Sequence, residues 1–140
     1  MTEGHFQTVL EQPGTGKKTD NVEKILFASG KVAIDLAERV KDGKDFDHLH
    51  IVRVEQLYPF PADKISDIIS RYPNAKELVW VQEEPKNMGS WHFANSYIRE
   101  VADGKKVSYV GRIHRSSPSE GDGESHKIEQ NRILDEALKK

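Results

Sequence analysis

Leu78-Val79-Trp80-Val81, followed at once by Gln82-Glu83-Glu84-Pro85, is a short apolar run with a polar exit. Three other runs of the same kind are Ile25-Leu26-Phe27-Ala28, Leu49-His50-Ile51-Val52 and Val107-Ser108-Tyr109-Val110. Segments with helical spacing separate them. Short apolar runs that alternate with helices are typical of βαβ units, in which the strands pair in parallel. The four runs therefore predict strands of one mostly parallel sheet.

Four segments between and after these runs place apolar residues on one helical face. The apolar positions are Val32, Ala33, Leu36, Ala37 and Val40; Ile65, Ile68, Ile69 and Tyr72; Ala94, Tyr97, Ile98 and Val101; and, in a helix from about Ser125, Ile133, Leu134, Ala137 and Leu138. Ser29 and Ser90 stand where N-caps are expected, and Pro61 suits a first turn. Near-continuous apolar strands are usually covered on both faces. The sequence thus predicts an α/β fold, a three-layer α/β/α sandwich with a mostly parallel sheet.

The composition of the 140 residues fits one globular domain. A chain of this length buries a sizeable core, so it needs neither disulfides nor a metal for stability. It has no cysteine, and 21 basic against 23 acidic residues give no reason to expect nucleic acid or an anionic membrane as partner. No apolar run approaches the ~20 residues that span a bilayer, and the N-terminus has no leader pattern. We expect an untargeted, cytoplasmic protein.

The first 22 residues differ from the rest of the chain. They contain Pro13-Gly14-Thr15-Gly16-Lys17-Lys18 and show no apolar periodicity, which is typical of an extended segment or loop. The glycines and lysines do not match a nucleotide-triphosphate loop, because no glycine stands five residues before Gly16. We expect residues 1–22 to be an extended lead-in or linker from a preceding domain and residues 23–140 to form the folded domain.

Polar residues follow each predicted strand. In an open α/β sheet, ligands bind beyond the carboxyl ends of the strands, where helix N-termini offer free N–H groups. The residues at this edge are Ser29, Gly30 and Lys31; Arg53 and Glu55; Gln82, Glu83 and Glu84; and Gly111, Arg112, His114 and Arg115. An ordinary capped turn explains Ser29-Gly30-Lys31 as well as a phosphate site does. The three arginines at the same edge favour an anion site.

Adjacent Glu83 and Glu84 suggest general acid and base catalysis, because neighbouring carboxylates can split their pKa values. Consecutive residues leaving a strand point to opposite sides, however, so the two carboxylates need not converge on one substrate atom. Salt bridges to Arg53 or Arg112 are the simpler interpretation. We expect a structural or interface role.

The histidines do not predict a metal site. They are His5, His48, His50, His92, His114 and His126. No two of them stand at helical i, i+4 spacing around a glutamate. His48 and His50 could face one side of a strand, but this spacing alone rarely means a metal site.

Two longer blocks exceed what the fold alone requires. They are Val52-Arg53-Val54-Glu55-Gln56-Leu57-Tyr58-Pro59-Phe60-Pro61 and Trp80-Val81-Gln82-Glu83-Glu84-Pro85-Lys86-Asn87-Met88-Gly89-Ser90-Trp91. Together they closely resemble the C-terminal domain of the dehydrogenase (decarboxylating) component of bacterial 2-oxoglutarate dehydrogenase complexes, a thiamine-diphosphate enzyme of the transketolase superfamily. The resemblance runs from Glu3 to the last helix. It implies the same three-layer fold, of the transketolase C-terminal-domain type.

The resemblance implies a parent enzyme with a larger role than this domain has. Such enzymes oxidatively decarboxylate 2-oxoglutarate in the tricarboxylic acid cycle and pass succinyl to a lipoyl-bearing succinyltransferase component. Thiamine diphosphate and magnesium sit between two upstream domains of a homodimer, so we expect no catalytic, cofactor-binding or metal-binding residue here. Gly121-Asp122-Gly123 resembles the start of the magnesium motif of these enzymes, but no apolar strand precedes it and the chain ends soon after. We expect a turn there.

Some bacterial members of the family, particularly actinobacterial ones, bind acetyl-CoA as an allosteric activator near this domain. Carried over through the Ser-Gly-Lys and Gln-Glu-Glu-Pro blocks, this implicates Ser29, Lys31, Arg53, Gln82 and Glu83, with Arg112 and Arg115 as weaker candidates. We expect the domain to serve structure, dimerisation and this regulation, and to be inactive alone.

Two alternatives remain at the sequence level. A stand-alone α/β module could use the same edge to hold a nucleotide-like anion or a protein partner. A relative that acts on another 2-oxoacid, such as 2-oxoadipate, also fits, because the substrate contacts would lie outside this chain. The opening Met1-Thr2-Glu3-Gly4-His5-Phe6 resembles a mid-protein segment and favours a longer parent protein over a stand-alone module.

Overall fold

A computed structural model of the chain describes residues 8–12, 19–41, 46–55, 60–85, 89–112 and 123–139. Strands and helices alternate along most of it. The elements are β1 (Val9–Glu11), β2 (Lys24–Ala28), α1 (Lys31–Arg39), β3 (Leu49–Val54), α2 (Ala62–Ser70), β4 (Glu77–Pro85), α3 (Gly89–Val101), β5 (Lys106–Arg112) and α4 (Gly123–Leu138).

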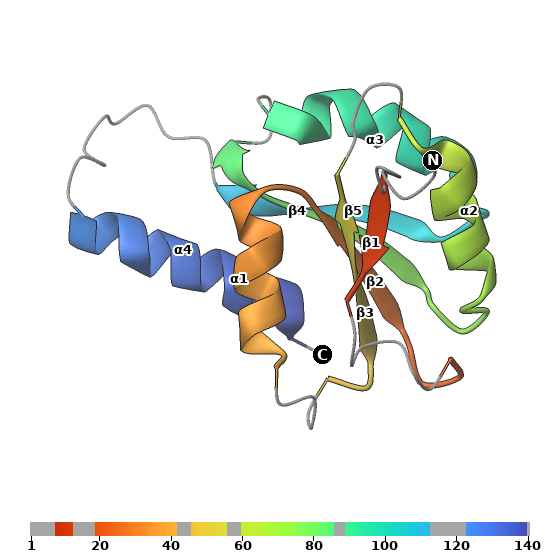
Figure 1. Cartoon of the computed structure of the whole chain (residues 1–140), viewed down its shortest axis with the longest axis horizontal. Helices are drawn as coiled ribbons and strands as arrows, with labels where there is room; N and C mark the ends of the chain where they lie inside the picture. The colour runs from red at the N-terminus through yellow and green to blue at the C-terminus, as the bar shows by residue number, and fades with distance from the viewer. Residues whose placement is uncertain are drawn as a thin grey trace, which may run out of the picture.

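One sheet lies at the centre of the domain, with the strand order β1-β3-β2-β4-β5 (Figure 1). β2 pairs in parallel with β3 and with β4, and β4 pairs in parallel with β5. Each of the four predicted apolar runs lies in one of these strands, so the predicted mostly parallel sheet is confirmed. The near-continuous burial of β2 and β3 follows from helices on both sides.

β1 is the strand that the apolar pattern did not reveal. It runs antiparallel to β3 at the edge of the sheet and pairs through Val9, Leu10 and Glu11 only. The backbone N–H of Gln12 donates to Ile51 and that of Glu55 to Thr8, at 2.9 and 2.8 Å, which extends the pairing at both ends. Three residues at a half-exposed edge are too few to carry a detectable period of two.

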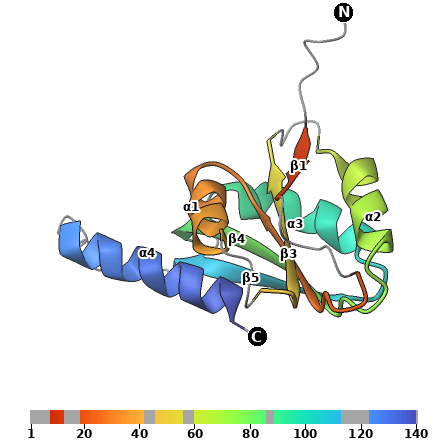
Figure 2. The ribbon, with the colours of Figure 1, turned by 60° about the horizontal axis from the view of Figure 1, so that its bottom comes forward.

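Helices cover both faces of the sheet, which confirms the three-layer sandwich. α2 and α3 bury Ile65 and Ile98 against Phe27 and Trp80 on one face. α1 and α4 bury side chains such as Leu36 and Ile133 against the other face. α1 lies beside α4 in both views of the ribbon (Figure 1 and Figure 2). The apolar faces predicted from helical spacing are thus the faces that pack on the sheet, except that Tyr97 of α3 is 37% exposed.

The helix starts differ from the prediction at both serines. The N-cap of α1 is Gly30, whose φ of 70° is a conformation that glycine adopts readily, and no side chain caps this helix. Ser90 lies inside α3, which begins at Gly89, and Pro61 is the N-cap of α2. α4 begins at Gly123, slightly before the predicted start near Ser125. Within the described ranges, no helix has the length and apolar character needed to cross a membrane.

Candidate functional site at the strand exits

The exits of β2, β3 and β4 lie side by side at one edge of the sheet. Ala28, the last residue of β2, is in register with Arg53 of β3 and with Val81 of β4. Ser29 therefore lies beside the end of β3 and beside Gln82. Parallel pairing thus brings together residues that are more than 20 positions apart in the sequence, as expected for strand exits in an α/β sheet.

Arg53 and Gln82 point to opposite faces of this edge. Arg53 lies on the face covered by α1, where it lines a groove together with Ala33 and Ala37. Gln82 lies on the α3 face and contacts Trp80 and Trp91. A ligand bound on one face would consequently touch only part of the predicted set.

The groove beside Arg53 has a volume of about 410 Å³ and lies between β1, β3 and α1. Its rim includes two exposed apolar side chains, Leu10 and Ile34, which are 38% and 48% accessible. Arg53 Nε forms an ion pair with Glu55 of the same chain segment. Within the part of the chain that the structure describes, Arg53 therefore pairs with Glu55 and not with Glu83 or Glu84, one of the pairings that the sequence suggested.

Lys31 stands at the start of α1 with most of its side chain in solvent. Its Nζ lies 3.3 Å from Asp35 Oδ2, and the lysine side chain is 71% exposed. Asp35 also accepts a hydrogen bond from Gln130 Nε2 of α4, at 2.7 Å. Exposed i, i+4 ion pairs are weak and screened by salt, so the ammonium group of Lys31 is accessible to a stronger anionic partner. Ser29 is half-buried just before it.

Gln82 is 3% exposed, and both polar atoms of its side-chain amide form hydrogen bonds within the domain. Its Oε1 accepts hydrogen bonds from Trp80 Nε1 at 3.0 Å and from the backbone N–H of Trp91 at 2.8 Å. Its Nε2 donates to the carbonyl oxygen of Glu84 at 3.1 Å. These bonds hold the exit of β4 against the first turn of α3, and the side chain would have to break them before it could contact a ligand.

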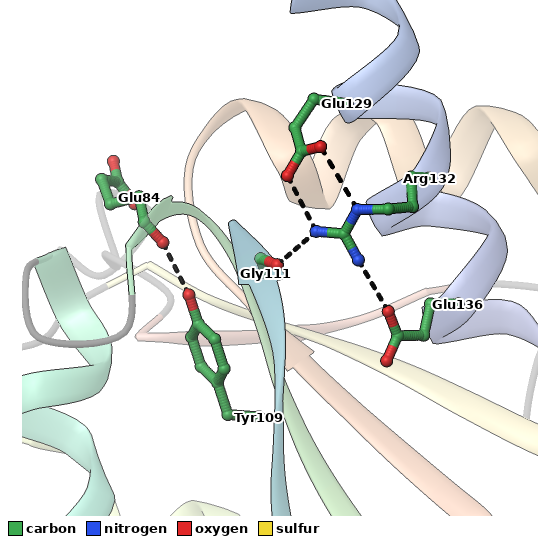
Figure 3. A network of polar contacts seen from close by, with 6 residues as sticks. All are labelled: Glu84, Tyr109, Gly111, Glu129, Arg132 and Glu136. Carbon is green, nitrogen blue, oxygen red and sulfur yellow. Dashed lines mark hydrogen bonds and ion pairs between the residues drawn. The ribbon is translucent and has the colours of Figure 1, made fainter. Parts of the chain in front are cut away.

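Tyr109 and Gly111 of β5 complete this exit (Figure 3). The Tyr109 hydroxyl donates to the carbonyl oxygen of Glu84 at 2.7 Å. Burial, reinforced by the charge of Glu84 and opposed by a hydrogen bond with Gln82, raises the pKa of Tyr109. A Cβ on Gly111 would lie 2.6 Å from the backbone oxygen of Gln82 and would also collide with the Tyr109 hydroxyl. This close approach therefore requires glycine at position 111.

Arg132 of α4 is an important residue that the sequence reasoning missed. One of its Nη atoms donates to the carbonyl oxygen of Gly111 at 2.6 Å and to Glu129 at 2.9 Å, while the other donates to Glu136 at 2.8 Å (Figure 3). Hydrogen bonding to Glu129 raises the pKa of the Arg132 guanidinium, although partial burial opposes it. The i, i+3 and i, i+4 spacing of these charges was the available signal.

Two other predicted site residues lie at or beyond the described part of the fourth exit. Arg112 ends β5, and its backbone is in register with Pro85 of β4. The side chain of Arg112 and the whole of Arg115 lie outside the described residues, as do His114, Gly121 and Asp122.

His48 and His50 contact different elements. His48 Nε2 lies 3.1 Å from the carbonyl oxygen of Leu138 in α4. His50 Nε2 lies 2.8 Å from Glu11 Oε1 of β1. Among the described residues, no three histidine, aspartate or glutamate side chains form a group that could hold a metal ion.

Comparison with known proteins identifies relatives of the whole chain. Residues 1–138 match the family described as 2-oxoglutarate dehydrogenase C-terminal. The chain is 54% identical over 140 residues to the 2-oxoglutarate dehydrogenase E1 component of an Exiguobacterium species, which covers 99% of this chain and 15% of the relative. It is 55% identical over 141 residues to the protein of that name from Geobacillus kaustophilus, covering 100% of this chain and 15% of the relative.

A third relative, the 2-oxoglutarate dehydrogenase E1 component of Bacillus cereus, is 49% identical over 142 residues, with 99% of this chain and 15% of the relative covered. The chain thus spans about 15% of the length of the curated relatives that it matches. It belongs to the 2-oxoglutarate dehydrogenase C-terminal family.

Proposed function

We propose that this chain is the C-terminal domain of a 2-oxoglutarate dehydrogenase E1 component and that it serves structure, dimer formation and regulation in that enzyme. The match of residues 1–138 to the family carries this proposal. The domain boundary is part of it: residues 1–22 lead in from a preceding domain and supply β1 to the edge of the sheet, and residues 23–140 form the rest of the sandwich. The strand exits support a scaffolding role, because the polar groups of Gln82, Tyr109 and Arg132 form hydrogen bonds within the domain.

The parent enzyme, in this proposal, is a cytoplasmic homodimer that decarboxylates 2-oxoglutarate oxidatively in the tricarboxylic acid cycle. It uses thiamine diphosphate with magnesium and passes succinyl to a lipoyl-bearing succinyltransferase component. The cofactor supplies the carbanion chemistry. We assign the cofactor, the metal and the catalytic groups to the upstream domains, since the chain spans only about 15% of the length of its curated relatives. The isolated chain is therefore catalytically inactive.

The regulatory part of the proposal concerns acetyl-CoA. Lys31 and Arg53 contact its phosphates from the α1 side of the edge, with Ser29 and Glu83 beside them. Gln82 does not contact the ligand directly but positions the end of β4, because its side-chain amide is hydrogen-bonded to Glu84 and Trp91. Arg112 and Arg115 are further candidates at the fourth exit. The accessible ammonium group of Lys31 and the groove beside Arg53 support this arrangement.

A calorimetric titration of the purified chain with acetyl-CoA tests the regulatory role. We expect saturable binding that weakens at least about tenfold, or 1.4 kcal/mol, in Lys31→Ala and in Arg53→Ala. Lys64→Ala is the matched control, because Lys64 is exposed on α2. Binding that is equal in all four proteins would contradict the assigned residues, and no binding by the chain would remove the regulatory role from the isolated domain.

A separate assay tests the assignment of catalysis. The purified chain is incubated with 2-oxoglutarate, magnesium and thiamine diphosphate, and carbon dioxide release is followed. We expect no release above that of the same mixture without protein. Measurable decarboxylation by pure chain would refute the proposal that the catalytic groups lie in upstream domains.

A further inference from the structure

The carboxylate of Glu11 is the point at which β1, β3 and the end of α2 meet. Its Oε1 lies 2.8 Å from His50 Nε2 and forms an ion pair with Arg71, which follows α2. Because a carboxylate only accepts hydrogen bonds, His50 Nε2 is the donor. His50 is 2% exposed, and its ring centroid lies 5.0 Å from that of Tyr72. One side chain of β1 is thus tied to two other elements.

The other attachments of β1 are few. It pairs with β3 through three residues, and its opposite edge faces away from the sheet. Val9 is partly buried against the core, but Leu10 is 38% exposed. The parallel strands, in contrast, are buried along most of their length. Segments with few buried apolar contacts open at lower free energy than the core.

We propose that Glu11 is a latch that holds β1 as a strap across the edge of β3, and that release of this latch lets β1 open as a unit while the parallel sheet stays folded. The bonds of Glu11 to His50 and Arg71 are charge-assisted, and such bonds are about twice as strong as neutral ones. They join β1 to a buried histidine and to a helix end that belong to the core. Losing them leaves β1 with its backbone pairing to β3, the flanking bonds of Gln12 and Glu55, and the packing of Val9 and of the partly exposed Leu10.

Opening of the strap changes the opposite face of the sheet. Successive residues of a strand point to opposite sides, so Glu11 faces α2 while Leu10 faces α1. Leu10, Glu11 and Gln12 line one side of the groove of about 410 Å³ beside Arg53. A released β1 removes this side of the groove and widens access to Ile51 and Arg53. The bonds of Glu11 on the α2 face therefore control access to the groove on the α1 face, whichever ligand binds in that groove.

Acid provides one way to release the latch. Burial raises the pKa of Glu11, but hydrogen bonds from Arg71 and His50 outweigh it, so the pKa lies below the ordinary value of 4.5. The groups facing Glu11 are His50 from β3 and Arg71 and Tyr72 from the end of α2. Because the folded pKa is lowered, the stabilisation is complete above the unfolded value and is lost as the pH falls through the folded value.

Hydrogen exchange of two backbone amides tests the latch directly. The N–H groups of Gln12 and Glu55 make the bonds that flank the β1–β3 pairing. Two other amides report on the rest of the sheet. The N–H of Lys76 donates to the carbonyl oxygen of Glu23, and the N–H of Lys106 donates to the carbonyl oxygen of Lys76. In Glu11→Gln at neutral pH, we expect Gln12 and Glu55 to exchange at least about tenfold faster, which equals 1.4 kcal/mol of opening free energy. Lys76 and Lys106 should change less than twofold.

Glu38→Gln is the matched control. Glu38 is exposed on α1 at the same groove, and its side chain has no partner among the described residues. This variant removes one carboxylate charge and should leave all four amides within twofold of the original chain. Equal acceleration of Gln12 and Glu55 in both variants would overturn the latch, because it would attribute the effect to net charge.

Two other results would also overturn the proposal. One is unchanged exchange of Gln12 and Glu55 in Glu11→Gln, and the other is equal acceleration of all four amides, which would mean that β1 opens only with the whole domain. Should Glu11→Gln not fold, the unsubstituted chain gives the same answer when the pH is lowered from neutral to below the lowered pKa of Glu11, after correction for intrinsic exchange. Selective loss of protection at Gln12 and Glu55 in acid supports the latch, and uniform loss refutes it.

Discussion

The side-chain oxygen of Gln82 lies 2.8 Å from the backbone nitrogen of Trp91, which joins the exit of β4 to the first turn of α3. The first N–H groups of a helix lack intrahelical partners. The side-chain oxygen of Gln82, which lies in the neighbouring strand β4, accepts a hydrogen bond from one of these N–H groups. The same oxygen also accepts a hydrogen bond from Trp80 Nε1. A polar residue at the strand exit thus serves as a helix cap from outside the helix.

Replacement of Gln82 by leucine should destabilise the domain by about 2–4 kcal/mol. Two buried donors, Trp80 Nε1 and the Trp91 N–H, would lose their acceptor, and a buried unsatisfied group costs about 1–3 kcal/mol. Chemical denaturation with tryptophan fluorescence measures the change. The control is Glu83→Gln, a half-buried neighbour, which should shift stability by less than about 0.5 kcal/mol. Similar losses in both variants would contradict the capping role of Gln82.

Replacement of Gly111 by alanine should cost about 1–3 kcal/mol through overpacking. The new Cβ would meet the backbone oxygen of Gln82 and the hydroxyl of Tyr109, which is held by its bond to Glu84. A double-mutant cycle checks the cause. In a Tyr109→Phe background the ring can move aside, so the alanine penalty should shrink. An equal penalty in the two backgrounds would show that Tyr109 does not constrain this position.

The parallel strands and the packed helix faces were predictable from the sequence because each rests on a local period of apolar residues. β1 was not, since three residues at a half-exposed edge carry no such period. The N-cap of α1 was misplaced because the chain turns at Gly30 through a positive φ, and not through the side chain of Ser29. Backbone conformation of this kind leaves little trace in residue spacing.

The strand-exit edge was also predictable, but the use of each residue there was not. Strand order and parallel register follow from the βαβ pattern, so Ser29, Arg53 and Gln82 could be placed together. The direction of Gln82 depends on the buried donors of Trp80 and Trp91, which only packing brings within reach. The partner of Arg132 on β5 is a backbone carbonyl, and no residue type signals a carbonyl in the sequence.

Loss of Arg132 should loosen α4 from β5. Arg132→Gln removes the bonds to Gly111, Glu129 and Glu136, and we expect a loss of about 1–2 kcal/mol, because the guanidinium is one-third exposed and its ion pairs are partly screened. Arg132→Lys should recover only part of it, since an ammonium cannot make the forked contacts. Thermal denaturation measures both, and Lys127→Gln on the exposed side of α4 is the charge-matched control. A loss of the same size in Lys127→Gln would assign the effect to net charge.

Tyr109 should make the domain sensitive to alkali. Burial, reinforced by the charge of Glu84, raises its pKa above the ordinary value of 10.0. The folded state therefore keeps the phenolic proton at a pH where the unfolded chain has lost it, and stability falls as the pH rises from the unfolded towards the folded pKa. Tyr109→Phe lacks this group, so its stability should fall less steeply above pH 10, although at neutral pH it loses about 0.5–1.5 kcal/mol with the bond to Glu84.

Denaturation midpoints measured at neutral and alkaline pH test this expectation. Tyr72→Phe is a parallel variant, because burial also raises the pKa of Tyr72, and it should reduce the alkaline slope in the same direction. The two tyrosines lie in separate surroundings, Tyr109 in β5 and Tyr72 after α2, so the reductions should add in the double variant. An unchanged slope in Tyr109→Phe would mean that its phenol titrates alike in the folded and unfolded chain, and that the contact with Glu84 does not hold the proton.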